Sequence, residues 1–211
     1  MVISQSEYYI SPEEYLEGEK VSEIKHEYID GQVYAMAGAS DAHVTVVGNL
    51  FVLLRNHLRG SGCRVYMLDM KAQIDIINRY FYPDVMVTCD TRDKEFDYFK
   101  CHPSLIIEVL SESTEGYDRG KKFASYRHLE SLQEYVLISP DRMSVECFRR
   151  NQDGHWVLYP YEKGEEVHLA SVDFRCAMPT AGYTYAEIYE NVILVDENFP
   201  NPTFLDRFLK H

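Results

Sequence analysis

The feature that most constrains the fold is a glutamate in the middle of an otherwise apolar run. The run LIIEVL extends from Leu105 to Leu110, and Glu108 is its only polar residue. A short apolar run of this length is typical of a strand buried on both faces of a sheet. Burying an unpaired carboxylate costs several kcal/mol, so a buried Glu108 requires a positive partner. The alternative is an edge strand on which Glu108 faces water.

The size and composition of the chain favour one globular domain. It has 211 residues, of which 45% are hydrophobic, enough for one sizeable core. No apolar run approaches the roughly 18 residues of a membrane span, and the first residues lack the pattern of a signal peptide. We therefore expect a cytoplasmic protein without a membrane partner.

The net charge of −13 bears on possible partners. A protein that binds nucleic acid regardless of sequence usually has a basic surface, so this charge argues against that class. A protein with this net charge can still have a local basic cleft.

The cysteines predict neither a disulfide framework nor a zinc site. Their number is odd, and no two lie within three residues of each other. We expect reduced, mostly buried thiols. The five are Cys63, Cys89, Cys101, Cys147 and Cys176.

Turn and capping residues divide the first part of the chain. Ser11 and Pro12 predict a helix start, and the helix ends near Glu17. Asp30-Gly31 lies between two alternating runs and predicts a β-hairpin with strands at about 25–29 and 32–37. Ser40 predicts the cap of a helix over about 41–59.

The rest of the chain alternates strands and helices, which favours the α/β class. We predict a mixed sheet flanked by helices, with the N-terminal β-hairpin, in one domain over residues 1–191. Residues 192–211 would form a tail whose apolar side chains dock on the domain itself or on a partner. The expected strands are 64–67, 71–77, 84–88, 105–110, 134–138, 143–149 and 155–160; the expected helices are 116–129 and 185–191, and the apolar tail residues are Phe204, Leu205, Phe208 and Leu209.

Two further motifs could supply partners for Glu108. Asp84 follows Pro83 at the start of a predicted strand, although a Pro-Asp pair alone is ordinary turn chemistry. Asp118, Lys122 and Tyr126 are spaced four residues apart and share one helix face, whereas Lys121 points about 100° away. Taken alone, this spacing is equally typical of a surface ion pair.

Taken together, these residues predict a divalent metal site. Two carboxylates on neighbouring strands offer the hard oxygen ligands that Mg²⁺ prefers, and a lysine beside them can hold a phosphate oxygen or a water. Nearby basic residues could contact phosphates, or they could form a solvated helix face. They are Lys100, Arg119, Lys121, Lys122 and Arg127.

Several motifs in order resemble a known family. Pro83-Asp84, then Ile107–Ser111, then Asp118–Tyr126 are similar to the Uma-type family described as "putative restriction endonuclease", which is assigned to the PD-(D/E)XK nuclease superfamily. The resemblance extends over roughly residues 11–191. It also includes residues 26–31, 36–43 and 131–138.

The resemblance implies a role for each candidate residue. Asp84 and Glu108 would be metal carboxylates, with Glu27 from the hairpin as the third acid and Mg²⁺, or Mn²⁺ in its place, as the ion. The position where the superfamily motif has its lysine is Leu110 here, so the lysine would come from the next helix. Lys122 matches that position best and Lys121 second. His43 and Asp69 could also face the cleft, with less weight than Glu27.

The leading functional hypothesis is a Mg²⁺-dependent endonuclease that hydrolyses DNA phosphodiester bonds. The alternative is a nuclease-fold binding or assembly module with weak or no catalysis, whose ligand is a second copy of the chain, a homodimer being favoured, or a partner protein. The displaced lysine and the charge of −13 favour this alternative. A third hypothesis is a metal-dependent hydrolase of a smaller phosphate ester.

Overall fold

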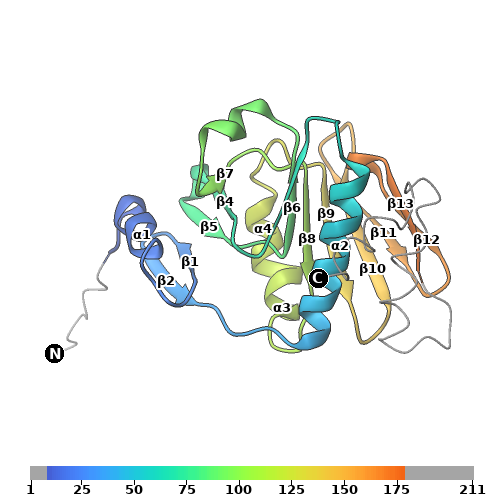
Figure 1. Ribbon diagram of the computed structural model, residues 1–211, viewed down its shortest axis with the longest axis horizontal. Coiled ribbons are helices and arrows are strands. Elements are labelled where there is room, and N and C mark those ends of the chain that lie inside the picture. Colours follow the sequence, from blue (N-terminus) through green and yellow to red (C-terminus); the bar gives the residue numbers. More distant parts are fainter. Residues whose placement is uncertain (1–8, 179–211) are drawn as a thin grey trace, which may run out of the picture. The chain divides into compact units, whose positions relative to one another are not determined.

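A computed structural model describes residues 9–178 of the chain. Its strands form a central six-stranded sheet, a five-stranded sheet and a two-stranded ribbon, with helices on both faces of the central sheet (Figure 1). The predicted helix at 185–191 and the predicted apolar tail residues Phe204, Leu205, Phe208 and Leu209 lie outside the described residues. In the described part, no helix is long and apolar enough to cross a membrane.

The central sheet has the strand order β11-β10-β9-β8-β6-β3. Strands β8 and β9 are parallel, and the other neighbours are antiparallel, so the sheet is mixed as predicted. Every residue of β8 is buried, including Glu108. Because β8 lies between β6 and β9, the alternative of an edge strand facing water is wrong. The bounds are β3 Arg64–Met67, β6 Val85–Thr88, β8 Leu105–Val109, β9 Glu134–Ser139, β10 Ser144–Arg150 and β11 Trp156–Tyr161.

The second sheet has the order β2-β1-β5-β4-β7. The predicted hairpin is confirmed: β1 and β2 pair antiparallel with Ile29 opposite Gln32, and Asp30 and Gly31 both have positive φ between them. Strand β5 was not predicted, because its three residues are too few to show an alternating pattern. The bounds are β1 His26–Ile29, β2 Gln32–Ala35, β4 Lys71–Ile74, β5 Arg79–Phe81 and β7 Phe99–Lys100. Short 3₁₀ turns η1 Asp75–Ile77 and η2 Thr91–Glu95 follow β4 and β6.

A two-stranded ribbon closes the described part of the chain. Strands β12 Glu166–Leu169 and β13 Phe174–Ala177 pair antiparallel around the 3₁₀ turn η4 Ala170–Val172. No pattern in the sequence predicted these strands.

The first two helices begin where the capping residues predict. Helix α1 Pro12–Glu19 has a capping box between Ser11 and Glu14. Helix α2 Asp41–His57 begins at Ser40, whose hydroxyl accepts a hydrogen bond from the backbone N–H of His43. This cap fixes the first turn of α2 and, with it, the position of His43.

The helix predicted over 116–129 is divided into three short pieces. They are α3 Glu115–Tyr117, a π-helical turn η3 Asp118–Lys122, and α4 Phe123–Tyr126. The prediction of one regular helix was wrong, and Gly120, a weak helix former, lies inside the irregular turn. Asp118, Lys122 and Tyr126 are nevertheless all buried, so they form no solvated surface pair.

The two faces of the central sheet have separate cores. Alternate residues of a strand point to opposite faces. In β8, Leu105 and Ile107 pack with residues of α2, whereas Ile106 packs with β4, β5 and α4. Glu108 has the same parity as Ile106, so its side chain points to the face that carries Lys122 and Tyr126.

One prediction about the cysteines is wrong. Cys63 and Cys89 form a disulfide between the start of β3 and the end of β6. Arg64 pairs with Thr88, so the register brings these two cysteines opposite each other, 4.0 Å apart at Cα. Their separation of 26 residues gave no sign of this, because only the strand pairing makes them neighbours. Cys101, Cys147 and Cys176 are free thiols, as expected.

Candidate functional site

The candidate site is built on two neighbouring strands that carry Asp84 and Glu108. In the antiparallel pairing of β6 and β8, Val85 lies opposite Ile107. One further step in this register brings Asp84 opposite Glu108, where side chains of facing residues are in contact range. The backbone N–H of Val109 donates a hydrogen bond of 2.8 Å to Oδ2 of Asp84, which confirms this alignment. The strand pairing therefore brings together two acids that lie far apart in the sequence.

Asp84 has a second partner from helix α2. Nε2 of His43 lies 2.9 Å from Oδ1 of Asp84, and both side chains are about 15% exposed. The hydrogen bond with Asp84 raises the pKa of His43 above its usual value. His43 thus belongs to the site, although its sequence pattern pointed there only weakly. The sequence feature that could have located His43 is the helix cap at Ser40, because a helix that begins there has His43 in its first turn.

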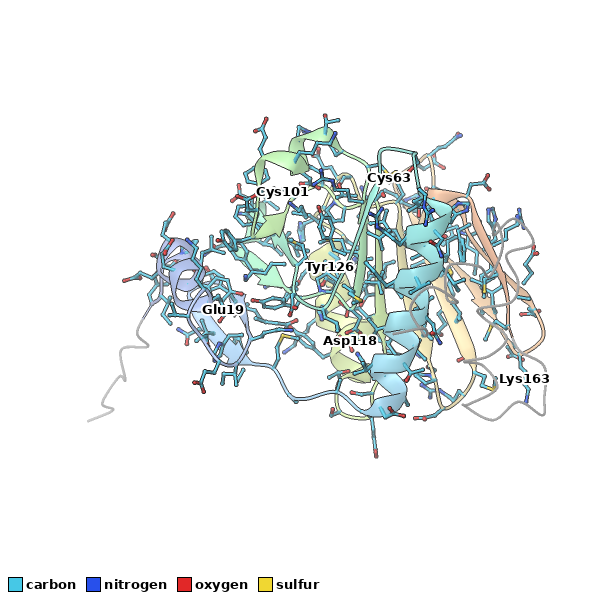
Figure 2. All side chains as sticks on the ribbon, in the orientation of Figure 1. Glu19, Cys63, Cys101, Asp118, Tyr126 and Lys163 are labelled. Carbon is cyan, nitrogen blue, oxygen red and sulfur yellow. A yellow bond between two sulfur atoms is a disulfide. The ribbon has the colours of Figure 1, made fainter. Side chains whose placement is uncertain are left out.

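Lys122 is the cation that Glu108 requires. Its Nζ lies 3.0 Å from Oε1 of Glu108 and 3.1 Å from Oε1 of Glu27. The hydroxyl of Tyr126 donates a 3.0 Å hydrogen bond to the same oxygen of Glu108. Glu27 comes from β1 and reaches the cluster through Lys122, and its role as a third metal ligand stays a prediction. Figure 2 labels Asp118 and Tyr126, which lie on the helical pieces that carry Lys122.

The cluster contains more negative than positive groups. Asp118 lies 3.8 Å from Nζ of Lys122, so three carboxylates surround one ammonium, and Asp84 adds a fourth negative group beside Glu108. Burial raises the pKa of Glu108 well above its usual value; Lys122 opposes this shift and Asp84 adds to it. Burial also raises the pKa of Asp118. The site therefore favours the binding of a further cation or of protons.

Lys122 itself stays charged. Burial alone would lower its pKa, but Glu108, Glu27 and Asp118 outweigh that effect and raise it. A lysine in this state donates hydrogen bonds and cannot accept a proton. It acts as a fixed positive charge.

The other predicted residues lie elsewhere. Lys121 is exposed, so Lys122 is the lysine of the cluster. Asp69 is exposed and pairs with Lys25. Among the basic candidates for phosphate contacts, Arg119 pairs with Glu115 and Glu146, and Lys100 is buried and donates to backbone carbonyls. Arg127 stacks over the ring of Phe123.

The donor set of the site suits a hard divalent ion held by two carboxylates. Within residues 9–178, no three His, Cys, Asp or Glu side chains are grouped closely enough to bind one ion. Mg²⁺ is commonly held by one or two carboxylates and keeps several waters. Of the two oxygens of Glu108, only Oε1 has a partner among the described residues. Oε2 of Glu108 and the carboxylate of Asp84 are thus the oxygens that fit Mg²⁺.

Sequence comparison identifies related proteins over most of the chain. The profile of the Uma2 family, described as "Putative restriction endonuclease", matches residues 12–179. "Uncharacterized protein slr1290" of Synechocystis sp. is 43% identical over 169 residues, which are 80% of this chain and 89% of that protein. "Uncharacterized protein sll1609" of the same organism is 38% identical over 148 residues, 69% of this chain and 83% of the relative.

A solved structure shares the fold. It is the crystal structure of "a putative nuclease belonging to DUF820" from Anabaena variabilis ATCC 29413. The TM-score is 0.66 at 17% sequence identity, and the match covers 87% of this chain and 99% of that one. The predicted restriction-endonuclease-like α/β fold is therefore confirmed.

Proposed function

The chain belongs to the Uma2 family, described as "Putative restriction endonuclease", and from this premise we propose that it is a Mg²⁺-dependent endonuclease that hydrolyses DNA phosphodiester bonds. The observation that carries the proposal is the cluster itself. Asp84, directly before β6, lies opposite Glu108 of β8, and a charged Lys122 lies 3.0 Å from Glu108. Family membership supports nuclease chemistry, and the cluster supports Mg²⁺ as the cofactor.

The metal would be held by Asp84 and Glu108. When bound, Mg²⁺ supplies a Lewis acid that stabilises charge on the attacked phosphate and lowers the pKa of a bound water. Hydrogen bonds from the protein orient both carboxylates. The backbone N–H of Val109 holds Asp84, and the hydroxyl of Tyr126 holds Glu108, so neither carboxylate is free to rotate.

Lys122 and Glu27 complete the cluster in different roles. Because Lys122 stays protonated, it would donate hydrogen bonds to a phosphate oxygen or to the attacking water, and it would not act as a general base. Glu27 holds Lys122 in place through the 3.1 Å ion pair. His43, bonded to Asp84, would orient that carboxylate. Lys121 has no role in this proposal.

A plasmid-nicking assay tests the proposal. Supercoiled plasmid is incubated with the protein in Mg²⁺ or Mn²⁺, and the nicked form is measured over time. We expect metal-dependent nicking that falls at least about 100-fold in Asp84→Asn and in Glu108→Gln, the range typical of losing electrostatic stabilisation of the transition state. Asp69→Asn is the matched control, since it removes one exposed carboxylate outside the cluster, and it should nick like the parent.

Two outcomes would contradict the proposal in different ways. Equal nicking by all variants would mean that Asp84 and Glu108 do not perform the reaction. No nicking by the parent protein would favour the binding or assembly module, which the net charge of −13 also favours. Turnover of a small phosphodiester without plasmid nicking would identify a hydrolase of small esters. That the protein forms a homodimer is a prediction. Light scattering during size-exclusion chromatography measures the molar mass and tests it.

A further inference from the structure

A second charged feature lies at the opposite end of α2 from the candidate site. It is an open pocket of about 700 Å³, and its three charged lining residues, Arg55, Arg64 and Lys94, are all basic. We name this feature the basic pocket. In Figure 2, the label of Cys63, which also lines the pocket, lies toward one end of α2, and the label of Asp118 lies toward the other. The basic pocket is therefore separate from the acidic cluster.

The cations of the basic pocket are available to a ligand. Most other arginines in the described chain are bound to acids or backbone carbonyls, as are Arg119, Arg142, Arg149 and Arg175. In contrast, no acidic side chain among residues 9–178 lies within ion-pair distance of the three pocket cations. All three are exposed. Three like charges around one pocket repel each other, and an anion would relieve that repulsion.

The pocket is assembled from parts that the fold holds firmly. Arg55 lies in the last turn of α2, Arg64 begins β3, and Lys94 lies in η2. The disulfide between Cys63 and Cys89 joins the strand of Arg64 to the strand that leads into η2.

The segment that carries Lys94 has an anchor of its own. The carboxylate of Asp93 is buried and accepts hydrogen bonds from the hydroxyl of Thr88 and from the backbone N–H groups of Cys101 and His102. Lys94 is therefore presented by a fixed backbone, and its side chain can turn toward a ligand in the pocket.

The distance between the two features fits a nucleic acid strand. Arg64 and Met67 are separated by three residues of β3, which is about 10 Å, and Met67 pairs with Val85, the neighbour of Asp84. Along one DNA strand the axial rise is about 3.4 Å per nucleotide, so this separation corresponds to about three nucleotides. Because the four carboxylates of the cluster repel phosphates, a DNA substrate needs cations elsewhere.

We propose that the basic pocket binds backbone phosphates of a DNA strand about three nucleotides or more from the phosphate at Asp84 and Glu108. This inference rests on the proposed nuclease function and adds the residues that hold the substrate. Arg55, Arg64 and Lys94 would contact phosphate oxygens and would not read the base sequence. The shared chemistry is phosphate, so free inorganic phosphate is the competing ligand.

Binding measurements on the full chain test the inference. A triple variant, Arg55→Ala with Arg64→Ala and Lys94→Ala, is compared with the parent by fluorescence anisotropy on a labelled DNA duplex. EDTA is present so that the DNA stays intact, and the salt concentration is varied. We expect at least about tenfold weaker binding at low salt, and a slope of log K against log salt that is smaller by about 2 to 3.

A charge-matched variant controls for the lost positive charge. Lys20→Ala with Lys163→Ala and Arg175→Ala also removes three exposed cations, and none of them lines the basic pocket. It should keep a salt slope within about one of the parent. Circular dichroism and thermal unfolding check that both variants are folded.

Each result has a definite meaning. The inference is overturned when the pocket variant and the control bind DNA alike. It is also overturned when the pocket variant keeps DNA affinity but loses thermal stabilisation by inorganic phosphate, since the pocket is then a free-anion site. Loss of DNA affinity in the pocket variant supports the inference even when the parent nicks no plasmid, in which case only the nuclease proposal fails. If the parent nicks plasmid but the pocket variant binds DNA as tightly as the parent, the nuclease proposal holds and the inference about the basic pocket fails.

Discussion

Two buried glutamates on adjacent parallel strands, Glu108 on β8 and Glu134 on β9, have opposite surroundings. Glu134 is completely buried, and a cation and several hydrogen-bond donors contact its carboxylate. Arg149 pairs with it, and the hydroxyl and backbone N–H of Ser171 donate to its Oε2 at 2.8 and 3.0 Å. Glu108 shares its one cation, Lys122, with two other carboxylates, Glu27 and Asp118, and Asp84 adds a further negative charge nearby.

The difference separates a structural role from a functional one. A buried carboxylate with enough donors joins parts of the fold, and Glu134 joins β9 to the turn η4 through Ser171. A group of carboxylates with too few cations is costly for folding, because burial disfavours their ionised forms. Such a cluster is expected where a ligand supplies the missing charge. Glu108 therefore marks a binding site, and Glu134 marks a structural joint.

The largest expected effect tests the structural half of this comparison. Glu134→Ala leaves the guanidinium of Arg149 without its acid and removes the acceptor of Ser171. Breaking a buried pair in this way costs about 3–5 kcal/mol of unfolding free energy. Urea unfolding measures the loss, with Glu166→Ala as control, since Glu166 forms an exposed pair with Arg175 and should cost under about 1 kcal/mol. A loss in Glu134→Ala no greater than in the control would end the distinction between the two glutamates.

The sequence predicted the parts of the fold that depend on local patterns. The LIIEVL run showed that β8 is buried on both faces, and Asp30-Gly31 showed the hairpin. It also predicted that Asp118, Lys122 and Tyr126 share a face, although a π turn divides their helix. These features follow from residue spacing within one segment.

The parts that were missed depend on contacts between distant segments. The bond between His43 and Asp84 joins α2 to the start of β6, 41 residues apart. The disulfide of Cys63 and Cys89 exists because β3 and β6 pair in one register. Neither contact has a local pattern, so no spacing in the sequence indicated it. The contacts of Glu134 with Arg149 and Ser171 could not be predicted for the same reason.

A smaller effect tests the functional half of the comparison. Mg²⁺ at ten times its dissociation constant should raise the unfolding free energy by about 1.4 kcal/mol, because it binds the folded site alone. Thermal unfolding with and without Mg²⁺ measures this gain without any reference to catalysis. Asp84→Asn should abolish it, and Asp69→Asn should keep it. A gain that is equal in all three proteins would show that Mg²⁺ binds away from the cluster.

The smallest effect concerns how the stability contributed by Glu108 depends on pH. The pKa of Glu108 is raised in the folded protein, so its ionisation opposes folding. This penalty is absent below the usual glutamate pKa of about 4.3. It grows as the pH rises toward the raised pKa and is constant above it. Glu108→Gln keeps the hydrogen-bond acceptor for Tyr126 without the charge, so in EDTA its stability relative to the parent should increase as the pH rises.

Glu115→Gln should show the opposite dependence. Hydrogen bonds from Arg119 and Arg142 lower the pKa of Glu115. Its ionised form therefore supports folding, and that support is present above the usual glutamate pKa and lost as the pH falls through the lowered one. Relative to the parent, the Gln variant should lose stability as the pH rises. Urea unfolding of both variants between acid and neutral pH measures the two trends. If Glu108→Gln follows the same trend as Glu115→Gln, then Lys122 satisfies the charge of Glu108 as fully as Arg149 satisfies that of Glu134.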